Sequence, residues 1–237
     1  MTSIPSDVAL ICSNADGVGA SAYDPHPIPP TIDGPYAIIQ RRTPLLIVIS
    51  GPSGVGKDAT VRRMKELGLP FQFVVTTTTR PPRPDEAEGV DYYFVSKERF
   101  EEMIARGELL EHALVYNDYK GIPKKQVRDA LGSGIDVIMR LDVQGAATIH
   151  RLIPGAILIF LVASSEEELV QRLRQRRTEC EESLRTRLEM ARREMECIEE
   201  FDYVIVNSHC HLNQTVQQIE SVICAEKCRV ELRKIDL

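Results

Sequence analysis

Short apolar runs alternate with charged, amphipathic segments along most of the chain, from Leu45 to Arg229. The runs are four to eight residues long, which is typical of buried strands. They predict strands at Leu45–Ser50, Phe71–Thr76, Tyr92–Val95, Leu109–Val115, Asp136–Leu141, Ala156–Ala163 and Tyr203–Val206. The segments between them predict helices after Ser50, at Ser96–Arg106, from Pro123 to near Gly132, between Leu141 and Ala156, and at Glu166–Arg177, Glu182–Ile198 and Leu212–Arg229. Such alternation implies an α/β fold, a parallel sheet covered by helices on both faces.

A glycine-rich loop joins the first predicted strand to the first predicted helix. It reads Gly51-Pro52-Ser53-Gly54-Val55-Gly56-Lys57-Asp58. Backbone N–H groups of such a loop converge on phosphate oxygens, the helix N-terminus adds partial positive charge, and Lys57 adds a full charge. The pattern predicts a phosphate-binding loop. The alternative is a glycine turn that binds nothing.

Residues 1–40 differ in composition from the remainder. They contain no Lys or Arg and are rich in Pro, Gly, Ser and Ala, so we expect a mostly disordered tail over residues 1–43. An organelle transit peptide would be rich in Arg. Six cysteines lie scattered without a disulfide or zinc spacing, which favours a reducing compartment. We therefore expect a cytoplasmic protein, with organelle import left open.

Charge and hydropathy exclude some classes of partner. The formal net charge is −6, which gives no overall attraction to nucleic acid or to an anionic membrane. The apolar runs are far shorter than a membrane span. The sequence therefore predicts neither a nucleic-acid-binding nor a membrane protein.

A proline-stiffened loop carries two arginines that can face one anion. Arg80 and Arg83 lie three residues apart, after a run of threonines that begins at Thr76 and before Tyr92. A guanidinium matches phosphate geometry, and proline reduces the entropy lost when the loop closes. A solvated basic turn is an equally good interpretation of the loop alone.

Two acidic residues stand in or just after apolar strands. Glu111 lies within Leu109–Val115, and Asp142 follows Asp136–Leu141. The carboxyl ends of parallel strands are where such sheets bind ligands. A carboxylate there can accept from the adjacent ring N–H and amino group of guanine, a pair that adenine lacks. For either acid alone, a salt bridge is the favoured alternative.

Arginines recur through the two charged helices near the C-terminus. Arg172 and Arg176 share a helix face, and Arg187 follows in the next helix. Like charges at this spacing repel unless an anion arrives between them. Because glutamates flank the series, a solvated, salt-bridged helix pair is the alternative.

These motifs occur together, and in the same order, in one family. Over about residues 44–230 the chain resembles a guanylate kinase. The motifs that carry the resemblance are the glycine loop, Thr78–Pro84, Gly89–Tyr92, Asp142–Gly145, the spacing of Arg172 and Arg187, and Phe201–Tyr203. The resemblance implies a P-loop nucleoside-monophosphate kinase fold: a parallel-sheet core, a GMP-binding subdomain at about 77–123 and a helical lid at about 172–187. Residues 231–237 would form a C-terminal tail.

The resemblance also implies a role for each site residue. Gly51–Asp58 would hold ATP, with Lys57 reaching the transferred group. Thr76, Arg80, Arg83 and Tyr92 would grip the GMP phosphate, while Glu111 and Asp142 would bind guanine. Arg172, Arg176 and Arg187 would close over the phosphates. The reaction that the resemblance implies is ATP plus GMP to ADP plus GDP, in purine nucleotide metabolism, with Mg²⁺; the oligomeric state stays open.

Four residues depart from the family pattern. Lys120 stands where a tyrosine meets the GMP phosphate, which Lys120 can bind as a point charge, and Ile122 stands where a hydroxyl meets guanine O6. Arg140 replaces an acid, and Asp58 replaces the Ser or Thr that faces Mg²⁺. We expect Asp58 to hold Mg²⁺ through water.

Two other functions remain possible. A guanylate-kinase-like domain can be a non-catalytic module that binds phosphorylated protein segments. A kinase of the same fold can act on another phosphate acceptor. Lys57 and the arginines argue against the first, and Glu111 with Asp142 argue against the second.

Overall fold

The computed structural model describes residues 43–237 except 85, 116, 176–180 and 209. Within this part a five-stranded sheet has the order β2-β7-β1-β8-β9, and its ladders are parallel. The strands are β1 (Leu46–Ser50), β2 (Gln72–Phe73), β7 (Val137–Arg140), β8 (Ile157–Val162) and β9 (Tyr203–Val206). The α/β prediction is confirmed.

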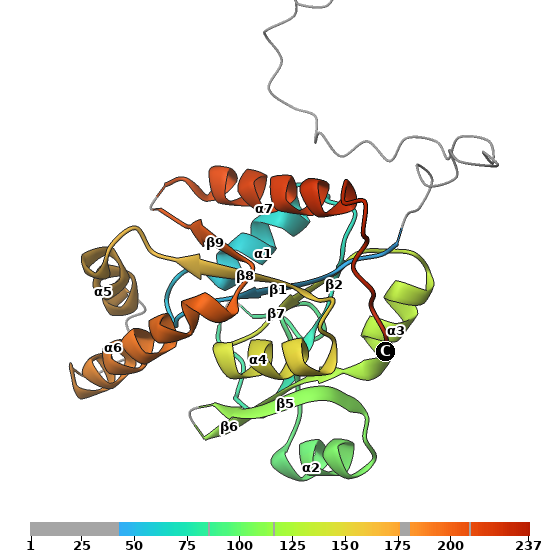
Figure 1. Cartoon of the computed structure of the whole chain (residues 1–237). Helices are drawn as coiled ribbons and strands as arrows, with labels where there is room; N and C mark the ends of the chain where they lie inside the picture. Colours follow the sequence, from blue (N-terminus) through green and yellow to red (C-terminus); the bar gives the residue numbers. More distant parts are fainter. Residues whose placement is uncertain (1–42, 85, 116, 176–180, 209) are drawn as a thin grey trace, which may run out of the picture.

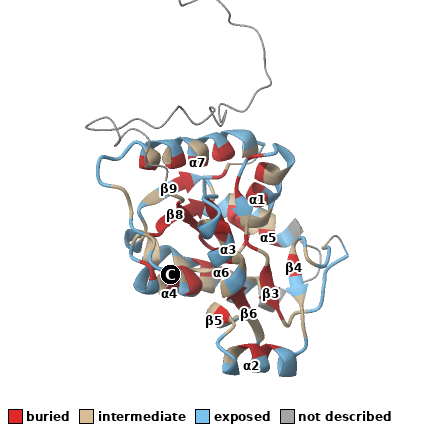
Figure 2. Cartoon of the chain, turned by 90° about the vertical axis from the view of Figure 1, so that its right-hand side faces the viewer, coloured by how far each residue is buried: buried red, intermediate tan, exposed pale blue. Residues whose placement is uncertain are grey.

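Helices cover both faces of this sheet (Figure 1). The strand residues alternate between two apolar clusters, because successive side chains of a strand point to opposite faces. Ile47 and Ile49 pack with α1 (Lys57–Glu66) and α7 (Leu212–Lys227). Leu46 and Val48 pack with α3 (Lys124–Gly132) and α4 (Val143–Leu152). Figure 2 shows the buried residues concentrated on these strands and on the inner faces of the helices.

A second, four-stranded sheet extends from the core. Its order is β4-β3-β6-β5, made of β3 (Thr76–Thr78), β4 (Tyr92–Phe94), β5 (Leu109–Val115) and β6 (Asp118–Pro123). The helix α2 (Lys97–Ala105) packs Phe100 and Met103 against it. Ser96 caps this helix by accepting a hydrogen bond from the Arg99 N–H at 3.2 Å.

Two predictions of strands need correction. The predicted strand Phe71–Thr76 is divided: β2 belongs to the parallel sheet, whereas β3 belongs to the second sheet. The strand β6 was not predicted. It has little apolar character of its own and is held by its antiparallel pairing with β3 and β5.

Two further helices precede the last strand. They are α5 (Glu166–Gln175) and α6 (Glu181–Met195), and a short 3₁₀ turn, Glu196–Glu200, follows α6. The predicted helix Glu166–Arg177 runs beyond Gln175 into residues outside the described part. The predicted disordered tail also lies outside it, apart from Thr43.

The residues after α7 pack on the domain. Arg233 donates to Asp202 at 3.1 Å and to Glu226 at 2.8 Å. Ile235 packs against the cluster beneath α4. The predicted C-terminal tail 231–237 therefore contributes contacts to the core. None of the described helices combines the length and apolarity needed to cross a membrane.

Candidate active site

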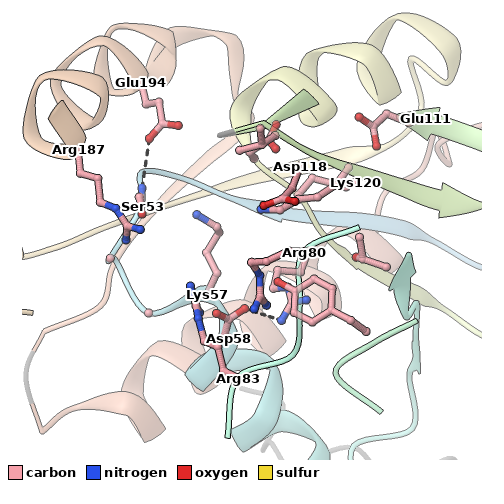
Figure 3. Close-up of a pocket in the computed structure, with 18 residues that line it drawn as sticks. Ser53, Lys57, Asp58, Arg80, Arg83, Glu111, Asp118, Lys120, Arg187 and Glu194 are labelled. Atoms are coloured by element: carbon pink, nitrogen blue, oxygen red, sulfur yellow. Dashed lines mark hydrogen bonds and ion pairs between the residues drawn. The ribbon is translucent and has the colours of Figure 1, made fainter. Parts of the chain in front are cut away.

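A cavity of about 340 Å³ lies between the two sheets and α6 (Figure 3). The residues predicted for the site that line it are Ser53, Gly54, Gly56, Lys57, Asp58, Thr76, Arg80, Arg83, Tyr92, Glu111, Lys120, Asp142 and Arg187. They come from distant parts of the sequence, so the fold brings the glycine loop, the arginine loop and the two acids to one space.

The glycine loop follows β1 and ends in α1. Gly51 has a φ of 130°, and a Cβ there would lie 2.1 Å from the Leu161 carbonyl oxygen. Gly56 has a φ of 95° and approaches the Asn207 amide so closely that a Cβ would lie 2.4 Å from its Nδ2. Only glycine suits both positions. The loop therefore has the backbone that a phosphate-binding turn needs.

Lys57 is fixed within this loop. Its ammonium donates to the carbonyl oxygens of Gly51 and Pro52, at 2.5 and 3.0 Å. Burial lowers its pKa to about 8, against the opposing effect of the Glu194 and Asp58 carboxylates. The side chain is thus mostly charged at neutral pH and carries its charge at the mouth of the loop.

A carboxylate that the sequence did not single out meets the same loop. Glu194, on α6, accepts a hydrogen bond from the Ser53 N–H at 3.1 Å (Figure 3). Burial raises its pKa, although the Lys57 charge opposes the rise. Glu194 therefore places negative charge beside the surface that would receive donor phosphates.

The second sheet and its loop bring Thr76, Arg80, Arg83 and Tyr92 to the cavity. Arg80 donates two bonds of 2.8 Å to the Glu86 carboxylate, and its guanidinium lies 5.2 Å from the Tyr92 ring centroid. The Arg83 N–H also donates to Glu86, at 2.9 Å. Thr76 is buried, and its hydroxyl makes no hydrogen bond within the described structure. An unpaired buried hydroxyl at a cavity wall suits a ligand oxygen.

Two carboxylates stand at the other end of the cavity. Glu111 is 4% exposed, and its carboxylate lies where a Cβ on Gly145 would be 3.0 Å away. Burial, then the Asp142 charge, raises its pKa to about 8, with Lys120 opposing. Asp142 caps α4 by accepting from the Gly145 N–H at 2.9 Å. The pair can accept hydrogen bonds from the edge of a base.

Comparisons with known proteins agree with this arrangement. A family model described as guanylate kinase matches residues 42–226. The chain belongs to the guanylate kinase family. The "Guanylate kinase 2, chloroplastic/mitochondrial" of Oryza sativa subsp. japonica is 52% identical over 195 residues, which are 82% of this chain and 68% of that protein. The guanylate kinase of Clostridium tetani is 44% identical, over 79% of this chain and 88% of its own.

A solved structure supports the same assignment. The crystal structure of guanylate kinase from Anaplasma phagocytophilum has a TM-score of 0.66 and 30% sequence identity, and covers 80% of this chain and 89% of its own. The predicted kinase fold, family and enzyme class are thereby confirmed.

The three arginines expected in a lid do not all reach the cavity. Arg172 lies beneath the glycine loop, where it donates to the carbonyl oxygens of Val55 at 3.0 Å and Asn207 at 2.6 Å. It thus supports the loop from behind in this structure. Arg187 lines the cavity from α6, and Arg176 lies outside the described residues.

The residues that depart from the family pattern are also placed. Lys120 lines the cavity, and burial lowers its pKa. Ile122 is fully buried in the cluster beneath α3 and α4 and does not line the cavity. Asp58 and Arg140 form an ion pair with each other.

Sequence reasoning missed two acids of the site. Glu194 is one of many glutamates on charged helices, so its position in the sequence did not distinguish it as a site residue. Asp118 lines the cavity and accepts from the Thr79 hydroxyl at 3.4 Å. Its alternation with Lys120 along one strand would have indicated it, had β6 been predicted.

Proposed function

We propose that the protein transfers the γ-phosphoryl group of ATP to GMP, giving ADP and GDP, in purine nucleotide metabolism. Membership of the guanylate kinase family makes it an enzyme that phosphorylates GMP with ATP. The observation that carries the site assignment is the single cavity that joins the glycine loop to the arginine loop and to Glu111.

The donor side would act through backbone N–H groups and one lysine. The loop and the N-terminus of α1 would hold the phosphates of ATP, and Lys57 would follow the transferred group. Phosphoryl transfer needs little covalent chemistry from the protein, so in-line positioning and neutralisation of charge do most of the catalysis. Arg187, from the second lid helix, would add charge to the transferring group.

The acceptor side would hold GMP at both of its ends. Thr76, Arg80, Arg83 and Tyr92 would bind its phosphate, with Lys120 as a further point charge. Glu111 and Asp142 would accept hydrogen bonds from guanine. A site built to pair buried polar groups rejects an analogue that leaves them unpaired. This arrangement favours GMP over AMP.

The donor side also fits Mg²⁺. Asp58 offers a carboxylate at the first turn of α1, and its side chain is 40% exposed and lines the cavity. No group of three or more His, Cys, Asp or Glu in the described part of the chain could hold a metal ion. We therefore assign the ion to the nucleotide phosphates, with Asp58 reaching it through water. Bound there, Mg²⁺ would neutralise charge on the phosphates.

The compartment is also proposed. The composition of residues 1–40 favours the cytoplasm. The name of the rice relative makes organelle import the alternative. A fluorescent protein fused behind residues 1–43 would decide between them by its location in cells. We propose no nucleic-acid or membrane partner.

One set of assays tests the proposed reaction. ADP release from ATP is measured in a coupled assay with GMP, dGMP, AMP, UMP or CMP as acceptor. We expect turnover with GMP and much less with the other bases. Turnover with a different acceptor would assign the enzyme to that substrate. No turnover, combined with binding of phosphorylated peptides, would make it a binding module.

A further inference from the structure

Arg140 makes contacts with both sides of the cavity. It ends β7, next to β1. Its guanidinium forms an ion pair with Asp58, on the donor side. The same group donates to the Asp91 carbonyl oxygen at 3.3 Å and lies 4.5 Å from the Tyr92 ring centroid, on the acceptor side. One side chain therefore connects the start of α1 to the loop that leads into β4.

Burial of the guanidinium makes Arg140 depend on its partners more than a surface arginine does. The Arg140 side chain is 13% exposed, whereas that of Asp58 is 40% exposed. A charge taken out of water needs its partners, because breaking a buried pair leaves an uncompensated ion. The position of Arg140 is thus determined from both sides.

Two guanidinium groups lie close to the Tyr92 ring. Arg80 is 5.2 Å from its centroid, and Arg140 is 4.5 Å from it. Tyr92 itself is only 8% exposed. A guanidinium over a ring is attracted by the ring quadrupole, most strongly where water is excluded. Arg140 therefore fixes the ring next to the arginine assigned to the acceptor phosphate.

We propose that Arg140 is a positioning residue. Through Tyr92 and the Asp91 backbone it fixes the conformation of the loop that leads into β4 on the acceptor side, while its ion pair with Asp58 connects Arg140 to the donor loop. The inference rests on the proposed function, because it names a residue through which the GMP site is formed. Arg140 acts through Tyr92 and need not touch either nucleotide. The ion pair also gives one physical reason for two departures from the family pattern, because Asp58 and Arg140 each supply the charge that the other needs.

The planar shape of the guanidinium makes the proposal testable. A lysine can keep a charge near Asp58, but it has no flat face to lie over Tyr92 and no fork to reach Asp91 at the same time. Arg140→Lys therefore tests the contacts with Tyr92 and Asp91 separately from the ion pair with Asp58. Arg140→Met removes the charge and the fork together.

Binding of GMP and of ADP is measured separately by calorimetry, without the other nucleotide, together with the melting temperature. For Arg140→Lys we expect a GMP dissociation constant raised about tenfold, in line with a lost buried cation–ring contact, and an ADP constant within about twofold of wild type. For Arg140→Met we expect both constants to rise, because Asp58 then loses the opposite charge of Arg140 beside the phosphates.

Arg62→Lys is the matched control. Arg62 faces the same loop from the outside, 3.9 Å from the Asp91 carboxylate, with a side chain 51% exposed. We expect it to leave both constants unchanged.

Three results would overturn the proposal. GMP binding by Arg140→Lys that equals wild type would mean that charge alone suffices. A lower melting temperature with unchanged GMP binding would make the residue merely structural. Equal weakening of GMP binding by Arg62→Lys would mean that the loop is sensitive to substitution of any neighbouring arginine, including an exposed one. Failure of the wild type to bind GMP would instead refute the proposed function.

Discussion

The two sheets build the two halves of the site in different ways. The parallel sheet presents the proposed donor loop at the end of β1, a strand whose residues are all buried. The second sheet presents the proposed acceptor side from short strands such as β3 and β4, with ion pairs such as Arg80–Glu86. The donor side is made mainly by the backbone, whereas the acceptor side is made by side chains that hold one another. Substitutions should therefore affect catalysis on the first side and selectivity on the second.

The largest effect should come from Lys57, whose charge lies at the mouth of the proposed donor loop. Lys57→Ala should lower kcat by several hundredfold, about 3–4 kcal/mol of transition-state stabilisation, with the melting temperature nearly unchanged. The reason is that the Lys57 ammonium bonds to the carbonyl oxygens of Gly51 and Pro52, and its loss removes no side chain from the apolar core. Steady-state kinetics with ATP and GMP measure this, and Lys97→Ala, an exposed change on α2, is the control. Near-normal kcat in a folded variant would contradict the assigned role of Lys57.

The next effect should be on base selectivity, through Glu111. Glu111→Gln should reduce the preference for GMP over AMP by about tenfold or more, because a buried polar edge then loses its matched partner. The ratio of kcat/KM for the two acceptors measures it. Glu108→Gln, at the half-buried approach to the same strand, should leave the ratio as it is. An unchanged ratio in Glu111→Gln would remove Glu111 from base recognition.

The raised pKa of Glu111 adds a pH dependence. Below its pKa of about 8 the free enzyme holds this group protonated, yet guanine needs the carboxylate. GMP binding should therefore release a proton, and affinity should rise as pH rises towards 8 and then level off, by roughly fivefold between pH 7 and 8. Calorimetry in two buffers of different ionisation enthalpy measures the proton release. Glu111→Gln should abolish the slope, and a slope that survives would assign it to another group.

A smaller effect, on ADP binding at the donor side, should come from Glu194. Glu194→Gln keeps an oxygen that can accept from the Ser53 N–H, but it removes a negative charge beside the phosphates. ADP should therefore bind about threefold to tenfold more tightly, a modest Coulomb effect at a partly solvated site, while GMP binding stays the same. Glu189→Gln, on the same helix and 55% exposed, is the control. Weaker ADP binding would show instead that the carboxylate stabilises the loop.

The same contrast explains what the sequence could predict. Runs such as Leu45–Ser50 and Ala156–Ala163 become strands because their own burial stabilises them, and the glycine loop is a local pattern. By contrast, β6 forms only where β3 and β5 offer partners, so Asp118–Pro123 shows no strand pattern. The ion pair of Asp58 with Arg140 joins residues that are far apart in the sequence. Such pairings depend on tertiary structure, which periodicity does not encode.

The smallest effect should come from deleting residues 1–40. The match to the family model begins at residue 42, and no residue before Ser53 lines the cavity among those described. The composition of the segment predicts no packed core. We therefore expect unchanged kcat and melting temperature for the shortened chain, and proteolysis of the full chain before Arg41.

A deletion only slightly longer provides the contrast. Removing residues 1–45 also takes away Thr43, whose carbonyl oxygen accepts from Lys227 at 3.5 Å, and Leu45, which is 1% exposed. The Leu45 N–H donates to the Asp136 carboxylate at 2.8 Å. Losing this buried side chain should destabilise the domain by about 2–5 kcal/mol, visible as a lower melting temperature. If the deletion of residues 1–40 lowered the melting temperature as much, that segment would pack on the domain, and the boundary between tail and core would lie earlier in the chain.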